Sequence, residues 1–339
     1  MGSPKVKPPS KFAPATHMNF WDFDDQPMQT LERPENTYHV PVLAEEVVAL
    51  LRPAPGMILL DGTAGGGGHT EKFLQHGAEV IALDQDRDAI AHCQQRLAAY
   101  RQRLRLVETN FENAAEALDS LGVPTVGGAL LDIGVSSHQL DTAERGFAIM
   151  KDGPLDMRMN RAGAQTAADI VNTASVAELA RIFREYGEEP RAMHIAARIV
   201  AMRGQRPLRT TFDLAAAVTS VIPRSGPRHP ATRIFQALRI ATNDELGVLE
   251  RGLVAVSSRL ARGARLAVIT FHSLEDRMVK VFFRTRSNEW IDRPEWPEPR
   301  RNPDRLFRLL TPRPMDASPE ETEANPRARS AKLRVVERL

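Results

Sequence analysis

From His39 onward, short runs of apolar residues alternate with segments in which apolar residues recur every three or four positions. The runs are typical of buried strands, and the spaced pattern is typical of helices with one face on a core. The pattern predicts strands at 57–61, 79–84, 105–108 and 128–133, and helices at 42–51, 70–76, 88–100 and 112–121. Strands that alternate with helices form βαβ units, so we predict an α/β fold with a parallel sheet.

This alternation stops after residue 139, and the next segment has no convincing strand. Helical spacing is found there at 166–172, 176–186, 190–203 and 211–221. The chain then continues with helices at 231–242, 244–260 and 274–286, strands at 265–271 and 331–336, and a proline- and arginine-rich loop at 290–314. We therefore divide the chain into a disordered tail (1–38), a first part of the core (39–139), an all-helical insertion (140–228) and a second part of the core (229–339).

Composition agrees with a soluble globular protein, since 42% of the residues are hydrophobic and 26% are charged. No uncharged apolar run approaches the ~18 residues of a membrane span, and the N-terminus lacks the apolar stretch of a secretory signal. The single cysteine, Cys93, excludes a disulfide framework and a cysteine-based metal site. We expect a cytoplasmic protein that does not associate with membranes.

Positive charge is concentrated in one region, although the formal net charge is only +2. Of the 45 basic residues 38 are arginines, and the range 190–240 holds one acid and nine of these arginines, at positions 191, 198, 203, 206, 209, 224, 228, 233 and 239. Such a stripe favours a polyanionic partner, because arginine binds phosphate groups well. The alternative is that arginine richness reflects genomic base composition.

A glycine-rich loop, DGTAGGGGH at 61–69, follows the first predicted strand. The dinucleotide pattern G-x-G-x-x-G would need a glycine where Thr70 stands, and no Lys-Ser/Thr completes a phosphate-binding loop. The pattern that remains, with Asp61, Gly65 and Gly67, resembles the first motif of class I methyltransferases, which bind S-adenosylmethionine. A tight turn without a ligand is the alternative.

Two further acids end predicted strands. Asp84 ends the second strand, where a carboxylate can accept hydrogen bonds from both ribose hydroxyls of a nucleoside cofactor. Its alternative role is to cap the next helix, although Asp86 and Asp88 are better placed for that. Asp132 lies at the end of the fourth strand, where an acid is costly without a partner, and its alternative role is a turn cap.

The segment TFHSLED at 270–276 follows the fifth predicted strand and has two readings. It could be catalytic, or Ser273 and Asp276 could form a variant of a capping box. The histidines at 39, 69, 138, 229 and 272 form no metal-ligand spacing, so we expect no metal. The G-x-S-x-G signature of many hydrolases is also absent from the sequence.

With these residues in place, the chain resembles the family of ribosomal RNA small subunit methyltransferase H, the bacterial 16S rRNA (cytosine-N4)-methyltransferases. The resemblance runs from His39 to the C-terminus and is carried by these blocks: HVPVL (39–43), DGTAGGGGH (61–69), ALDQD (82–86), LLDIGVSSHQLD (130–141), ERGF (144–147), DGPLDMRM (152–159), YGEE (186–189), HPATRIFQALRI (229–240), ITFHSLEDR (269–277) and NPRARSAKLR (325–334). Ten blocks in one order are not a chance match.

The resemblance implies a class I S-adenosylmethionine-dependent methyltransferase (Rossmann-like) core with an inserted all-helical subdomain. It implies S-adenosyl-L-methionine as the cofactor, with contacts from Gly67, Gly68, His69, Asp84, Phe111, Asp132 and Gln139. Phe111 would pack on the adenine, and ordinary core packing is its alternative. Ala64 and His138 depart from the residues that family members more often have, which are a bulky residue and proline respectively, and both could alter the rigidity of their loops.

The same resemblance implies transfer of a methyl group to the N4 amine of a cytidine in the decoding region of 16S rRNA, with the small ribosomal subunit as partner. Asp132 is then the tentative catalytic acceptor of a hydrogen bond from that amine. The insertion would bind the RNA, with tentative contacts from Arg145, Arg158, Arg228, His229 and Arg233.

Two alternatives stay open from the sequence. The first is a methyltransferase for another nucleic-acid amine, which usually has a D/N/S-P-P-Y/F motif where this chain has Asp132-Ile133-Gly134-Val135. The second is a non-catalytic ribosome-assembly factor, against which the glycine loop, Asp84 and Asp132 argue.

Overall fold

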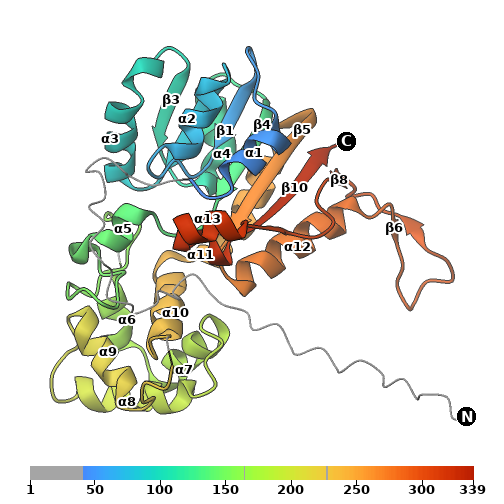
Figure 1. The fold of residues 1–339 in the computed structure, drawn as a ribbon. Coiled ribbons are helices and arrows are strands. Elements are labelled where there is room, and N and C mark those ends of the chain that lie inside the picture. Colours follow the sequence, from blue (N-terminus) through green and yellow to red (C-terminus); the bar gives the residue numbers. More distant parts are fainter. Residues whose placement is uncertain (1–40, 164, 227) are drawn as a thin grey trace, which may run out of the picture.

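The structure is a computed structural model, and it describes residues 41–163, 165–226 and 228–339. The predicted tail at 1–38 lies outside these residues. An α/β lobe forms the upper part of Figure 1, and a helical lobe hangs below it. The sheet of the upper lobe has eight strands, seven of which follow the order β3-β2-β1-β4-β5-β10-β8, while β9 pairs with β10.

The first five strands of this sheet are parallel. They are β1 (Ile58–Asp61), β2 (Glu79–Asp84), β3 (Leu104–Glu108), β4 (Val126–Asp132) and β5 (Leu260–Thr270). The remaining strands, β8 (Phe307–Leu309), β9 (Met315–Asp316) and β10 (Lys332–Arg338), pair antiparallel. The predicted α/β fold with its parallel core is therefore confirmed.

Helices cover both faces of the sheet, which explains why its strands read as nearly continuous apolar runs. Along β1 and β2 the side chains alternate: Leu59 and Val80 point to one face, and Leu60 and Ile81 to the other. The first face packs against α1 (Ala44–Leu51), α2 (Gly68–Gln75) and α3 (Arg87–Arg96). The second packs against α4 (Ala114–Ser120), α11 (Glu245–Ser258) and α12 (Ser273–Ser287).

The helical lobe has its own apolar core. It is formed by α6 (Ala167–Thr173), α7 (Val176–Glu185), α8 (Ala192–Arg203), α9 (Thr211–Thr219) and α10 (Thr232–Asn243). Among the described residues between 140 and 225 there is no strand beyond an isolated bridge of Pro154 with Thr210, as the sequence predicts. Because α10 packs against α6 and α7 as well as α11, the division at residue 229 stays a proposal.

The C-terminal region departs most from the sequence expectation. The predicted loop at 290–314 contains β6 (Trp290–Ile291) and β7 (Arg300–Arg301), which pair with each other, and also β8. A short helix, α13 (Pro319–Ala324), and a 3-10 turn, η4 (Pro326–Ser330), precede β10. β6, β7 and β8 have only two or three residues each, too few to show a period, and the proline-rich sequence around them indicates a loop. In the described part of the chain, no helix is long and apolar enough to cross a membrane.

Candidate active site

A cavity opens at the carboxyl edge of the parallel strands, where ligands bind in folds of this kind. The segments that follow β1, β2, β3 and β4 all contribute to its wall. Six of the predicted cofactor residues line the cavity: Gly68, His69, Asp84, Phe111, Asp132 and Gln139. The cavity is also lined by residues that sequence reasoning missed, namely Gln85, Asn110, Met159, Asn243, Glu245, Val248, Phe271 and Arg327.

The glycine loop owes its course to left-handed backbone conformations, with φ of 51° at Gly65 and 78° at Gly67. Gly67 begins α2 and faces α3, because a Cβ there would lie 3.1 Å from Cys93 Sγ and from Leu97. The structure therefore shows that Gly67 is needed for the turn. The contact of Gly67 with a cofactor stays a prediction. Asp61 ends β1 and is buried, and it accepts a hydrogen bond of 2.6 Å from the Thr70 hydroxyl.

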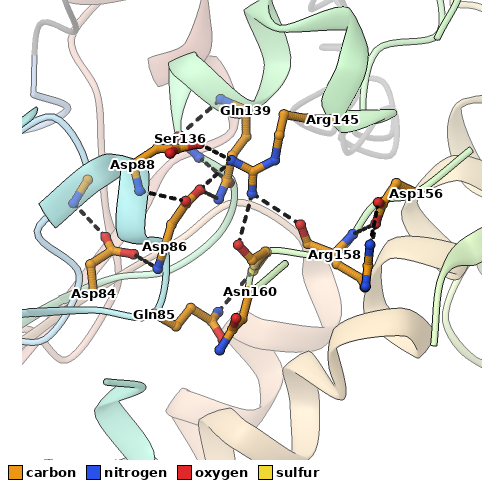
Figure 2. Close-up of polar contacts among 12 residues, drawn as sticks. Asp84, Gln85, Asp86, Asp88, Ser136, Gln139, Arg145, Asp156, Arg158 and Asn160 are labelled. Carbon is orange, nitrogen blue, oxygen red and sulfur yellow. Dashed lines mark hydrogen bonds and ion pairs between the residues drawn. The ribbon is translucent and has the colours of Figure 1, made fainter. Parts of the chain in front are cut away.

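Asp84 faces the glycine loop across the cavity floor. Its Oδ2 accepts a hydrogen bond from the main-chain N of Gly65 and its Oδ1 one from that of Asp86, each 2.8 Å long (Figure 2). Burial raises the pKa of Asp84 to about 6, against the lowering effect of these two bonds. The cap of α3 is Asp86, whose side chain accepts from the main-chain N of Asp88, so Asp84 remains available to a ligand.

Asp132 and His69 form the polar corner of the cavity. The Asp132 carboxylate lies 3.6 Å from Nε2 of His69, and its main-chain N donates to Thr63 Oγ1. Both ring nitrogens of His69 and Oδ1 of Asp132 are buried without a hydrogen-bond partner among the described residues. Buried polar atoms normally have partners, so these three atoms fit a polar ligand such as the amino-acid end of a nucleoside cofactor.

Phe111 serves the core and the cavity together. Its ring packs so closely on α11 that a Cβ added to Gly252 would lie 2.2 Å from Cδ2 of the ring. The side chain is 9% exposed and also lines the cavity. Both readings of this residue therefore have a structural basis, and its contact with an adenine stays a prediction.

Gln139 lines the cavity, but its polar atoms are used within the protein. It belongs to the short helix α5 (Ser137–Asp141), where it forms a capping box with Ser136. Its Oε1 accepts from the main-chain N of Ser136, and its Nε2 donates to Asp86 Oδ2 at 2.8 Å. A hydrogen bond from Gln139 to a cofactor would compete with these contacts, and that role stays a prediction.

Arg145 was predicted to contact RNA, and the structure places its side chain inside the protein instead. The residue ends a 3-10 turn, η3 (Ala143–Arg145), and only 2% of it is exposed. Its guanidinium donates to Asp86 Oδ2 at 2.6 Å and to the carbonyl oxygens of Arg158 and Met159 (Figure 2). A phosphate cannot reach a group that is enclosed and already bonded in this way.

The other predicted RNA residues are more accessible. Arg158 is half-buried and binds Asp156 through two nitrogens, at 2.7 and 2.8 Å, and Arg228 is half-buried as well. Nδ1 of His229 accepts from the main-chain N of Ala231, just before α10 begins. Arg233 leaves 39% of its side chain exposed and donates to the carbonyl of Glu188 at 3.2 Å. None of these contacts tests RNA binding, which stays a prediction.

Within the arginine stripe, two residues serve the fold. Arg203 donates to the carbonyl oxygens of Val171 and Ala174 at 2.8 and 2.7 Å, and Arg239 is buried against Glu245. The side chains exposed to solvent are those of Arg191, Arg198, Arg206, Arg209 and Arg224. The predicted contact with a polyanion is therefore wrong for the buried Arg239. A polyanion could bind only the accessible arginines of the stripe.

The segment at 270–276 is a helix cap, although with other residues than predicted. His272 and Glu275 form the capping box of α12, and Glu275 Oε2 also accepts from the main-chain N of Phe271. Although burial favours the neutral acid, His272 and Arg239 hold the pKa of Glu275 below its ordinary value. Ser273 instead donates to Glu188, and Asp276 binds Arg334.

This cap adjoins Glu245 in the cavity wall. Potential ligand atoms of Glu245, His272 and Glu275 lie within 4.8 Å of one another. The Arg239 guanidinium already binds Glu245 through two nitrogens. The positive charge beside these acids therefore comes from a side chain of the protein.

Comparison with known proteins identifies relatives over almost the whole chain. The model of the MraW methylase family matches residues 36–339. Ribosomal RNA small subunit methyltransferase H of Geotalea uraniireducens is 47% identical over 308 residues, which cover 89% of this chain and 99% of the relative. The protein of that name from Anaeromyxobacter dehalogenans is 50% identical over 305 residues, which cover 89% and 98%.

Solved structures align more loosely. An rRNA methylase from Streptococcus thermophilus aligns over 87% of this chain and 93% of its own, with 12% identity and a TM-score of 0.37. TrmN from Thermus thermophilus aligns over 88% of this chain and 48% of its own, with 13% identity and a TM-score of 0.38.

The sheet order, the glycine loop and the cavity, together with the family match, define a class I methyltransferase that uses S-adenosylmethionine. The helical lobe is its inserted subdomain. The chain belongs to the MraW methylase family, whose model matches a range that contains all of the described residues.

Proposed function

We propose that this protein transfers a methyl group from S-adenosylmethionine to the N4 amine of a cytidine in the decoding region of 16S rRNA. The observation that carries the proposal is the polar corner of the cavity. There, buried atoms of His69 and Asp132 have no hydrogen-bond partner among the described residues, at the edge of the sheet where folds of this kind bind ligands. The relatives named ribosomal RNA small subunit methyltransferase H support the choice of substrate.

The cofactor is held by residues of the carboxyl edge in this proposal. Asp84 accepts hydrogen bonds from the ribose hydroxyls, for which each carboxylate oxygen keeps a lone pair beside its main-chain bond. Phe111 packs on the adenine, while Gly68 and His69 face the amino-acid end. When bound, S-adenosylmethionine supplies a methyl group on a positively charged sulfur.

The target amine sets what the protein must do. The N4 lone pair of cytosine is delocalised into the ring, so the amine is a weak nucleophile. Asp132 accepts a hydrogen bond from this amine and orients its lone pair toward the methyl carbon. As the N–C bond forms, the bond between the methyl carbon and the cofactor sulfur breaks, and S-adenosylhomocysteine would be the leaving group. The methylated amine becomes acidic, and its proton would pass to the Asp132 carboxylate. A base inside a helix cannot reach the cavity, so the cytidine enters unstacked.

The partner in this proposal is the small ribosomal subunit, which also places the protein in the cytoplasm. The helical insertion, taken as 140–228, holds the RNA through its accessible arginines and through Arg158 and Arg228. His229 and Arg233, at the start of the second part of the core, add to this contact. Arg158 precedes Met159 in the chain and Arg233 shares α10 with Asn243, and both Met159 and Asn243 line the cavity.

The proposal is tested with isotopically labelled S-adenosylmethionine and three acceptors: small ribosomal subunits, free 16S rRNA and duplex DNA. Nucleoside mass spectrometry should find the label on N4 of cytidine from the subunit or the RNA. Label on adenosine or on DNA would support a methyltransferase for another nucleic-acid amine. Binding to the subunit without transfer to any acceptor would indicate an assembly factor.

A further inference from the structure

Arg145 joins two parts of the cavity wall that are distant in the sequence. One is the loop after β2, with Asp84 and Asp86, and the other is the segment that ends at Met159 (Figure 2). The ion pair with Asp86 measures 2.6 Å, and both side chains are at least 95% buried. Such a pair is weak evidence for stability, because desolvation offsets the attraction, so its position needs another explanation.

On the cofactor side, Arg145 acts on the acid that positions Asp84. Asp86 donates its main-chain N to Asp84 Oδ1 and caps α3 through its own Oδ1. Its second oxygen, Oδ2, accepts from Arg145 and from Gln139. Removal of the guanidinium would leave this buried oxygen underbonded, and the main-chain group that holds the Asp84 carboxylate would then shift.

On the opposite side, Arg145 holds a segment with an unusual backbone. Met157 has φ of 60°, in the left-handed region, and its main-chain N donates to the carbonyl of Arg145. One guanidinium nitrogen donates to the carbonyls of Arg158 and Met159. Asn243 of α10 holds the same segment from the far side, through the Met159 N and the Met157 carbonyl.

The Met159 side chain completes the link. It lines the cavity, is 6% exposed, and its sulfur accepts from Nε2 of Gln85, the residue between Asp84 and Asp86. The Arg145 guanidinium therefore holds the Met159 segment in place relative to Asp84, together with the contacts from Gln85 and Asn243. Lysine could not replace it, since a single ammonium lacks the planar fork that reaches a carboxylate and two carbonyls at once.

We propose that Arg145 is a positioning residue, which fixes the Met159 wall relative to Asp84 and so sets the separation between cofactor and target base. The cofactor part of this inference needs only the methyltransferase class, whereas the part about the target base rests on the proposed function. A positioning role differs from a purely structural one because it predicts a loss of cofactor affinity and turnover in protein that remains folded.

The experiment uses the full chain with Arg145→Lys and Arg145→Met. Arg203→Met is the matched control, since Arg203 also donates to two carbonyls but does so within the helical lobe, away from the cavity. Calorimetry with S-adenosylhomocysteine reports cofactor affinity, and hydrogen exchange reports the order of residues 156–160. Both are measured well below the unfolding temperature, together with kcat and KM on small subunits.

Both Arg145 variants should weaken S-adenosylhomocysteine binding several-fold and speed amide exchange at 156–160. They should lower kcat by about 10²-fold, the usual cost of a displacement near 1 Å, while the KM for RNA changes little. Arg145→Lys should not restore these values, and Arg203→Met should lower only the unfolding temperature. If the Arg145 variants do not fold, Asp86→Asn replaces them, because its side-chain oxygen can still cap α3 while the contact with Arg145 is lost. This variant should show the same loss of affinity for S-adenosylhomocysteine.

Unchanged cofactor affinity and kcat in folded Arg145→Met would overturn the inference. So would a change confined to the RNA KM and its salt dependence, because that is the signature of a phosphate contact. The calorimetric result does not depend on the substrate. If wild-type protein methylates neither the subunit nor rRNA, the proposed function fails, while the cofactor part of this inference is still decided.

Discussion

Nε2 of His69 lies 3.6 Å from Oδ2 of Asp132, and neither ring nitrogen of this buried histidine has a hydrogen bond within the described structure. The Asp132 carboxylate therefore forms no hydrogen bond with His69, and its Oδ1 has no hydrogen-bond partner among the described residues either. A buried imidazole and a buried carboxylate oxygen without partners at a cavity edge are costly unless a ligand satisfies them. The relationship explains why the site tolerates an acid at the end of an apolar strand.

Asp132→Asn should lower turnover far more than it lowers stability. The amide keeps the shape of the carboxylate but is a poorer proton acceptor, so kcat should fall by about 10²–10⁴. Single-turnover methylation at saturating cofactor, calorimetry with S-adenosylhomocysteine and the unfolding temperature are measured on the same variant. A near-normal single-turnover rate would exclude the catalytic role, and a rate restored by high cofactor concentration would assign Asp132 to cofactor binding alone.

Asp84 should make cofactor affinity dependent on pH. Its pKa is raised to about 6, so the acid is neutral in the free protein below that value and ionised above it. A carboxylate that accepts from ribose hydroxyls must be ionised, so affinity for S-adenosylhomocysteine should fall as the pH drops through 6 and stay constant above about 7. Calorimetry between pH 5 and 8 gives this profile.

The control for this prediction is Asp84→Asn, which should bind S-adenosylhomocysteine more weakly at pH 7.5 and show no pH dependence between pH 5 and 8.

The raised pKa of Asp84 also predicts how the stability of the fold depends on pH. Because the folded-state pKa is raised, the group favours the folded state at low pH and loses that contribution as the pH rises to about 6. If the Asp84→Asn variant has the same pH profile as the wild type, Asp84 does not belong to the cofactor site.

The accessible arginines of the insertion should set the salt dependence of RNA binding. Arg209 is exposed, and Arg233 leaves 39% of its side chain exposed. Changing both to Gln should reduce the slope of log affinity against log salt by about 0.7 for each single-strand phosphate that is no longer neutralised. Arg105→Gln, on the exposed part of β3 at the sheet edge, is the control. Equal slopes in all three proteins, with unchanged activity, would favour genomic composition as the cause of the stripe.

Arg239→Met should destabilise the fold strongly. Arg239 is 2% exposed, binds Glu245 through two nitrogens and lies 3.9 Å from Glu275. Its removal leaves two buried acids without their cation, which should lower the free energy of unfolding by about 3–5 kcal/mol. Urea denaturation at pH 7 measures this.

Arg251→Met is the matched control, because Arg251 also bridges two acids but leaves 54% of its side chain exposed. Exposed pairs contribute about 0–1 kcal/mol, so this variant should remain close to wild type. Equal losses of stability in the two variants would show that burial is not what makes the Arg239 cluster important.

Local patterns were enough to predict most of the regular elements and six of the residues that line the cavity. The bounds predicted for the second strand, 79–84, are those of β2, and the helix predicted at 176–186 is α7 with one extra residue at its end. Both have a clear period over six or more positions, because each buries a defined face. Asp84 and Asp132 were found because strand ends on one edge of a parallel sheet converge whatever the loops between them do.

Only the tertiary structure decided which charged residues face solvent. Arg145 lies in a block that the sequence associated with RNA, yet its partners are Asp86, 59 positions earlier, and the carbonyl of Met159. The partner of a buried guanidinium is chosen by packing between distant segments, and no local period records it. The far wall of the cavity, with Met159 and Asn243, was hidden for the same reason, because it forms only where the helical insertion meets the sheet.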